Sequence, residues 1–108
     1  MTERENQVRT LIAELENTLR RCERQAKQER IALVIKGAAP EGLKPRREVE
    51  LQPRPSDADL ANRVTAEIEK IVARWEADSG QWVERLALVW RGDPPIRIPE
   101  DLHFRQTS

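Results

Sequence analysis

The sequence has 108 residues, and its 19 basic and 19 acidic side chains cancel to a formal net charge of zero. A chain of this length fits one domain with a single modest core. Zero net charge provides no whole-molecule field that would steer polyanions or anionic lipid to the surface, and the single cysteine excludes an internal disulfide.

No apolar run is long enough to cross a bilayer. The longest runs, residues 31–35 and 86–90, fall far short of the roughly 20 residues that a transmembrane helix needs. The charged segment Met1 to Asn6 leads into no apolar stretch, so we expect no secretory signal and no membrane partner. One unpaired cysteine fits a reducing compartment, and we expect a cytoplasmic protein.

The first segment of the chain has the pattern of an amphipathic helix. Thr2 and Glu5 have the spacing of a capping box, which predicts that the helix begins there. Apolar residues then recur every three or four positions as far as about Lys27, so they share one face. They are Val8, Leu11, Ile12, Leu15, Leu19, Cys22 and Ala26.

Residues 31–36 alternate larger aliphatic side chains with smaller ones, which predicts a strand with two partly apolar faces. Glycines and prolines at 37, 40, 42 and 45 then interrupt regular structure. Residues 46–52 predict a second, more exposed strand that Pro53 and Pro55 close.

A second helix is predicted from about Ser56, the expected N-cap, to Asp78–Gly80. Residues 86–91 predict a third strand and 96–98 a short fourth strand that Pro99 restricts to an edge. We expect a loosely ordered C-terminal tail, residues 100–108, unless Leu102 and Phe104 dock on the body. The expected buried stripe of this helix is Leu60, Val64, Ile68, Ile71, Val72 and Trp75.

Residues 29–37 recur as residues 84–92, with six of nine positions identical. This repeat predicts a single domain, 1–108, built from two pseudo-repeats, 1–54 and 55–99. The expected fold class is α+β: an internally duplicated α-β-β-α-β-β two-layer sandwich with a mainly antiparallel sheet and two long amphipathic helices on one face. This arrangement resembles a circularly permuted ferredoxin-like sandwich, a similarity of architecture that implies no activity.

No motif predicts a catalytic, cofactor or metal site, so we expect no enzyme activity, no cofactor and no bound metal. Cys22 lies on the apolar stripe of the first helix, where a thiol packs as a small hydrophobe. His103 has only Glu100 and Asp101 nearby, at a spacing that matches no zinc pattern. The four glycines are scattered and form no phosphate-binding loop.

Two basic segments would form one phosphate-binding patch if the fold brought them together. Glu48 and Glu50 interrupt the second segment, and no set of aromatic residues accompanies the basic side chains. A nucleic-acid-binding module is therefore the alternative hypothesis. Its patch would comprise Arg20, Arg21, Arg24, Lys27, Lys44, Arg46 and Arg47.

The favoured hypothesis starts from the second face of the predicted sheet, because two helices cannot cover both faces of one sheet. An uncovered apolar face commonly binds a protein, and tryptophan is enriched in such interfaces. We expect Trp75 and Trp90 in the core, and a small non-enzymatic protein that acts as an accessory subunit, adaptor or inhibitor by binding a protein partner or a second copy. The expected interface residues are Ala32, Val34, Ala87, Val89 and Trp82.

Overall fold

The computed structural model describes residues 3–38 and 46–106. Helices α1 (Glu3–Ala26) and α2 (Ala58–Ser79) accompany the strands β1 (Ala32–Ala38), β2 (Arg46–Gln52), β3 (Gln81–Arg91) and β4 (Ile96–Gln106). The four strands form one antiparallel sheet in the order β2-β1-β3-β4. The predicted α+β class is confirmed.

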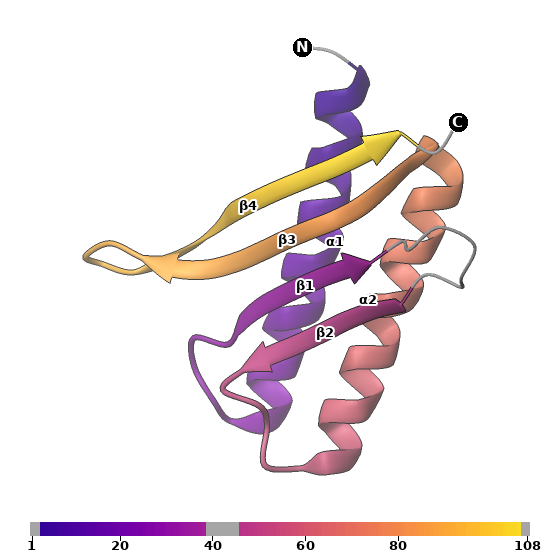
Figure 1. Ribbon diagram of the computed structural model, residues 1–108. Helices are drawn as coiled ribbons and strands as arrows, with labels where there is room; N and C mark the ends of the chain where they lie inside the picture. The colour runs from indigo at the N-terminus through magenta and orange to yellow at the C-terminus, as the bar shows by residue number, and fades with distance from the viewer. Residues whose placement is uncertain (1–2, 39–45, 107–108) are drawn as a thin grey trace.

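Both helices lie behind the sheet in Figure 1 and pack against the same face. They run antiparallel, because Gln7 near the start of α1 accepts a hydrogen bond from Trp75 near the end of α2, at 2.8 Å. Arg21, further along α1, pairs with Glu67, which lies earlier in α2.

The core lies between the helices and the sheet. Leu33 of β1 and Leu88 of β3 are fully buried and directly opposite each other in the two central strands. The apolar stripes of both helices close over this pair, as their three- and four-residue spacing predicts. The largest fully buried side chains include Leu11, Leu15, Leu19, Ile31, Leu33, Ile35, Ile68, Val72, Val83, Leu86 and Leu88.

The strand order corrects the ferredoxin-like resemblance. In a ferredoxin-like sandwich permuted to begin at a helix, the first strand would lie at an edge of the sheet. Here β1 is central and pairs with both β2 and β3. The predicted resemblance to a permuted ferredoxin-like sandwich is therefore wrong in its strand order.

The start of α2 also differs from the prediction, since the N-cap is Asp57 rather than Ser56. The backbone of Asp57 is extended, and its carboxylate accepts a hydrogen bond from the Leu60 amide at 3.2 Å. Aspartate caps a helix as well as serine does, so adjacent Ser and Asp leave the first residue ambiguous. Gly80 ends the helix with φ 71°, as predicted. The proposed cap Thr2 lies outside the described residues.

The last two strands are longer than predicted. β3 begins at Gln81, immediately after Gly80, and β4 continues through residues 100–106 that were expected to be loosely held. The register shifts on either side of Arg85, and Asp101 has φ 52°, so the two-residue alternation is interrupted. Phe104 fixes this extension because its ring lies 5.4 Å from that of Trp75.

A substitution at Gly37 tests how closely the backbone of β1 approaches the backbone of β3. A Cβ atom at this position would collide with the backbone carbonyl oxygen of Val83 and would lie 3.3 Å from Trp82 Nε1. Gly37→Ala should therefore lower the free energy of unfolding by about 1–3 kcal/mol, measured by urea denaturation. The exposed neighbour provides the control, since Lys36→Ala should change stability by less than about 0.5 kcal/mol. Equal stability of the two variants would contradict the close contact.

Candidate protein interface

The sheet has a face that the helices do not cover, and we call it the open face. Along β1 and β3, buried Leu33 and Leu88 point toward the helices, so their neighbours Val34, Ala87 and Val89 point the other way and are half-buried. Ala32, on the same side of β1, is also half-buried. Four of the five expected interface residues thus share the open face.

β4 extends this surface with two residues that the sequence reasoning did not include. Arg97 points toward the helices and is buried, so Ile96 and Ile98 on either side of it lie on the open face. Ile98 is opposite Val89 in the sheet, and Ile96 is 60% exposed. The alternation Ile96-Arg97-Ile98 was the signal that could have identified them.

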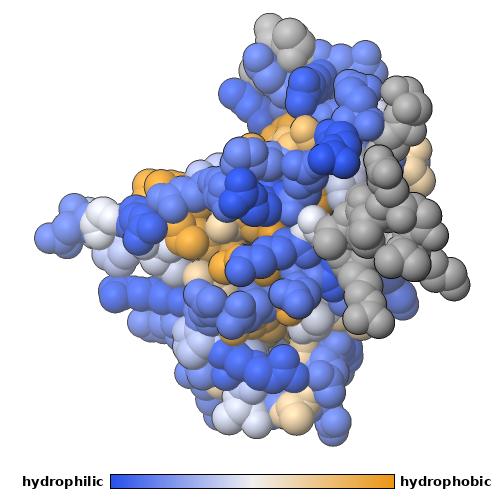
Figure 2. Space-filling model, viewed as in Figure 1, coloured by the Kyte–Doolittle hydropathy of each residue, from blue (hydrophilic) through white to orange (hydrophobic). Residues whose placement is uncertain are grey.

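These residues form one continuous surface, which we call the apolar strip. Val34 is opposite Ala87, and Val89 is opposite Ile98, so the strip crosses three strands. Figure 2, which views the open face, shows orange apolar patches with blue hydrophilic residues between and around them. The strip consists of Ala32, Val34, Ala87, Val89, Ile96 and Ile98.

Charged residues lie beside the strip and across it. Glu50 of β2 is opposite Val34, and Glu100 of β4 is opposite Ala87. Arg91 donates two hydrogen bonds to the Glu100 carboxylate, at 3.0 and 3.2 Å. The hydrogen bond to Glu100, and secondarily the negative charge of Glu100, raise the pKa of Arg91 above its ordinary value.

Both edges of the sheet carry features that oppose pairing with another strand. On β4, Pro99 lacks an amide hydrogen and the irregular backbone at Asp101 interrupts the ladder. On β2, Glu48 and Glu50 are exposed, and Pro53 follows the strand directly. A strand-edge interface is therefore less suited to this molecule than one through the open face.

Trp82, the fifth expected interface residue, lies near the start of β3, five residues before Ala87. It is half-buried, and the Arg47 guanidinium lies 5.1 Å from the centre of its ring. The structure therefore places Trp82 beside a polar cluster and not within the apolar strip.

Two clusters of the same composition connect the helices to the edge strands. In the first, the Arg97 cluster, Arg97 forms an ion pair with Glu23 at 3.1 Å and donates a hydrogen bond to the Ile31 carbonyl oxygen at 3.0 Å. Its guanidinium also lies 5.0 Å from the centre of the Trp90 ring. Glu16 also accepts from Arg97, at 3.3 Å. Because the Arg97 side chain is only 1% exposed, its charge depends on these partners.

The second, the Arg47 cluster, contains Arg47, Glu76 and Trp82. Arg47 pairs with Glu76 of α2, and the same carboxylate accepts a hydrogen bond from the Val83 amide at 2.9 Å. In the Arg97 cluster, Glu23 accepts the corresponding bond from the Ile31 amide, also at 2.9 Å. In both clusters a glutamate near the end of a helix has two partners. It accepts a hydrogen bond from a backbone amide at or just before the start of the next strand, and it pairs with an arginine of an edge strand.

The structure separates Arg47 from the other described members of the proposed basic patch, which lie together at or just after the C-terminal end of α1. Arg47 is bonded to Glu76, near the end of α2 that packs against Gln7. The basic residues of α1 lie toward its opposite end, and Gln7 and Arg24 are about 25 Å apart along the helix axis. Arg20 pairs with Glu16, and Arg21 pairs with Glu67. Lys44 lies outside the described residues, and so does the side chain of Arg46.

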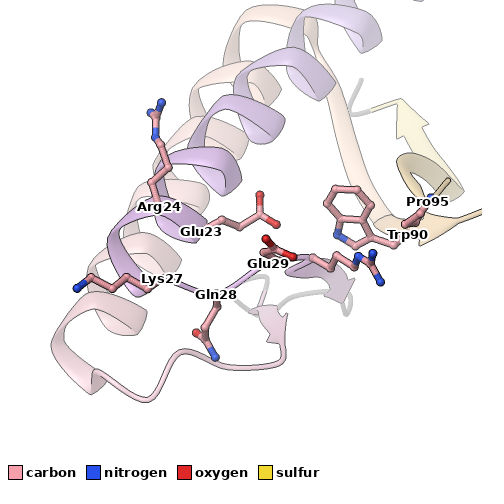
Figure 3. Close-up of a pocket in the computed structure, with 8 residues that line it drawn as sticks. Glu23, Arg24, Lys27, Gln28, Glu29, Trp90 and Pro95 are labelled. Carbon is pink, nitrogen blue, oxygen red and sulfur yellow. The ribbon is translucent and has the colours of Figure 1, made fainter.

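A pocket of about 610 Å³ lies at the end of α1, beside the turn between β3 and β4. Figure 3 shows Glu23 and Glu29 directed toward its middle, Trp90 and Pro95 on one side, and Arg24 and Lys27 directed away from Trp90. Arg24 and Lys27 form no ion pair within the described residues. The pocket thus combines a half-buried tryptophan with unpaired basic groups at its margin.

The remaining candidates for chemistry occupy ordinary structural positions. Cys22 is buried, and desolvation, with a smaller contribution from the neighbouring charge of Glu23, raises the pKa of its thiol above its ordinary value. His103 Nε2 lies 3.0 Å from a carboxylate oxygen of Asp101 on the same strand. Across residues 3–38 and 46–106, no group of three or more His, Cys, Asp or Glu side chains is arranged to hold a metal ion. Neither described helix is long and apolar enough to cross a membrane.

Comparisons with protein-family models, with curated proteins and with solved structures found no match for this chain.

The Arg97 cluster provides a stability test. Arg97→Met should lower the free energy of unfolding by about 3–5 kcal/mol, because it leaves Glu23 and the Ile31 carbonyl without their buried partner. Arg74→Met provides the control, since the Arg74–Glu14 pair is exposed and should contribute no more than about 1 kcal/mol. Thermal or urea denaturation measures both. Similar losses in the two variants would refute the structural role of Arg97.

Proposed function

We propose that this chain is a small non-enzymatic interaction protein that associates with a second copy of itself through the open face of its sheet. The observation that carries the proposal is the continuous apolar strip across β1, β3 and β4. Contiguous apolar surface of this kind on a soluble domain marks a site of association. As a self-associating protein it would serve as an accessory subunit, adaptor or inhibitor in the cytoplasm.

The size of the face indicates the strength of such a dimer. With a strand spacing of about 4.8 Å and a rise of about 3.3 Å per residue, the open face spans about 500 Å² in projection. Two such faces together lie near the lower limit of specific interfaces, about 1,000 Å² in total. The association is therefore expected to be reversible and dependent on concentration.

Substitutions on the strip test the proposal. Val34→Lys and Val89→Lys should weaken association at least about tenfold, because a long charged side chain in the middle of an apolar interface is costly to desolvate, even where Glu50 lies opposite it at position 34. Sedimentation velocity between about 10 micromolar and 1 millimolar measures the change, and circular dichroism checks the fold.

A matched pair of substitutions separates the open face from the helix layer. Ala87→Lys should weaken association in the same way, whereas Ala77→Lys, on the exposed side of α2, should leave it unchanged. A native chain that stays monomeric throughout this range, or a dimer indifferent to all three strip substitutions, would overturn the proposal.

Nucleic-acid binding is the second candidate, and the pocket in Figure 3 is the observation that favours it. Trp90, whose ring also contacts Arg97, lines the pocket, and Arg24 and Lys27 at the margin offer positive charge for phosphates. Glu23 and Glu29 in the middle of the pocket oppose a polyanion, which is why this candidate comes second.

Salt dependence tests this second candidate. A fluorescent single-stranded oligonucleotide should bind at about 50 mM salt and largely dissociate at about 200 mM, and Arg24→Glu should weaken the binding. Arg74→Glu, at a distance from the pocket on α2, is the control. Absence of binding at the lower salt concentration would eliminate this candidate.

We also propose that the chain arose by internal duplication as a two-layer sandwich of two α-β-β units. The repeated segments support this, since Leu33 and Leu88 occupy equivalent positions in the repeat and lie directly opposite each other. The order β2-β1-β3-β4 has the symmetry that a twofold axis between β1 and β3 would produce.

A further inference from the structure

The Arg91–Glu100 ion pair lies across the apolar strip. Val89 is opposite Ile98, Arg91 is two residues beyond Val89 along β3, and Ala87, opposite Glu100, is two residues before it. All of these side chains share the open face, because Leu88 and Arg97 between them point toward the helices. The two hydrogen bonds from Arg91 to Glu100 therefore pass over the Val89–Ile98 pair.

This position creates a conflict with a simple apolar dimer. Arg91 is 61% exposed and Glu100 is 38% exposed in the isolated chain. If a second copy covered the strip, the ion pair would either keep Val89 and Ile98 from contact or lose its partners in a desolvated interface. Buried charges without partners strongly oppose association.

The register of β3 and β4 resolves the conflict. Consider a twofold axis that lies between two facing sheets, runs perpendicular to the strands and passes over the Val89–Ile98 pair. This axis places Val89 against the partner's Val89 and Ile98 against the partner's Ile98. Because Arg91 and Ala87 are equally distant from Val89, the same axis brings Arg91 to the level of the partner's Ala87, next to the partner's Glu100 on the adjacent strand. Ala87 has only a methyl group and leaves room for a guanidinium above it.

We propose that the open faces pack about this twofold axis and that the ion pair is exchanged, so that Arg91 of each copy binds the partner's Glu100. The inference rests on the proposed self-association and specifies its geometry. The interface is then isologous, with the same patch on both copies. Each charged side chain still has an oppositely charged partner. Because the ion pair no longer passes over Val89 and Ile98, these residues can contact the same residues of the other copy.

A mixing experiment tests the exchange. Arg91→Glu gives a chain with two negative charges at these positions, and Glu100→Arg gives a chain with two positive charges. Each variant alone should associate at least about tenfold more weakly than the native chain, because like charges meet across the interface. An equimolar mixture should recover association as a heterodimer, since each chain then supplies the charge that the other needs.

An ion pair that stays within each chain cannot give this result, because it is broken in both variants and mixing does not repair it. General attraction between oppositely charged chains is controlled by Arg74→Glu mixed with Glu14→Arg, which makes the same charge changes on the helix layer. That mixture should associate no more tightly than the native chain. Sedimentation velocity with one fluorescently labelled variant identifies the heterodimer.

The outcomes separate the two proposals. If Val34→Lys breaks a native dimer but the variant mixture shows no recovery, the exchange is wrong and self-association through the strip stands. If the helix-layer control mixture associates more tightly than the native chain, by about the factor that separates the open-face mixture from its single variants, general charge attraction accounts for the result and the exchange is wrong. A native chain that remains monomeric would overturn both proposals.

Discussion

Two helices can cover only one face of a four-stranded sheet, and the rest of the structure follows from this constraint. The larger side chains of β1 and β3 meet the helices around Leu33 and Leu88, which are fully buried. The smaller ones, such as Val34 and Ala87, are left on the open face. Ile96 and Ile98 extend this apolar surface to the edge strand, so the molecule has a solvated helix layer and an opposite side with a continuous apolar strip (Figures 1 and 2).

The Arg97 and Arg47 clusters hold this arrangement together at its margins. Edge strands have a neighbour on one side only, and each cluster ties one of them to a helix through a charged pair. Glu23 and Glu76 serve two purposes, since each also accepts a backbone amide, from Ile31 and Val83 respectively. The orientation of Arg97 toward α1 also fixes the orientation of β4, and this places Ile96 and Ile98 on the open face.

Much of the architecture could be predicted from local patterns. The apolar stripe of α1, the alternation in residues 31–36 and the glycine after α2 each report on contacts within a few residues. The full length of β4 could not be predicted, because the irregular register around Arg85 and Asp101 interrupts the two-residue alternation of side chains. The burial of Arg97 depends on Glu23, which is distant in the sequence, so no local pattern encodes it. The same long-range geometry separates Arg47 from the basic end of α1.

The central claim is that the apolar strip is covered when copies meet. Its most direct test is the solvent accessibility of the methyl groups of Val34, Val89 and Ile98, measured by nuclear magnetic resonance with the soluble nitroxide TEMPOL at several protein concentrations. The account predicts strong relaxation of these methyls in dilute samples and protection as concentration rises, while Ala77 on α2 stays accessible throughout. Equal accessibility of the strip methyls at every concentration would contradict it.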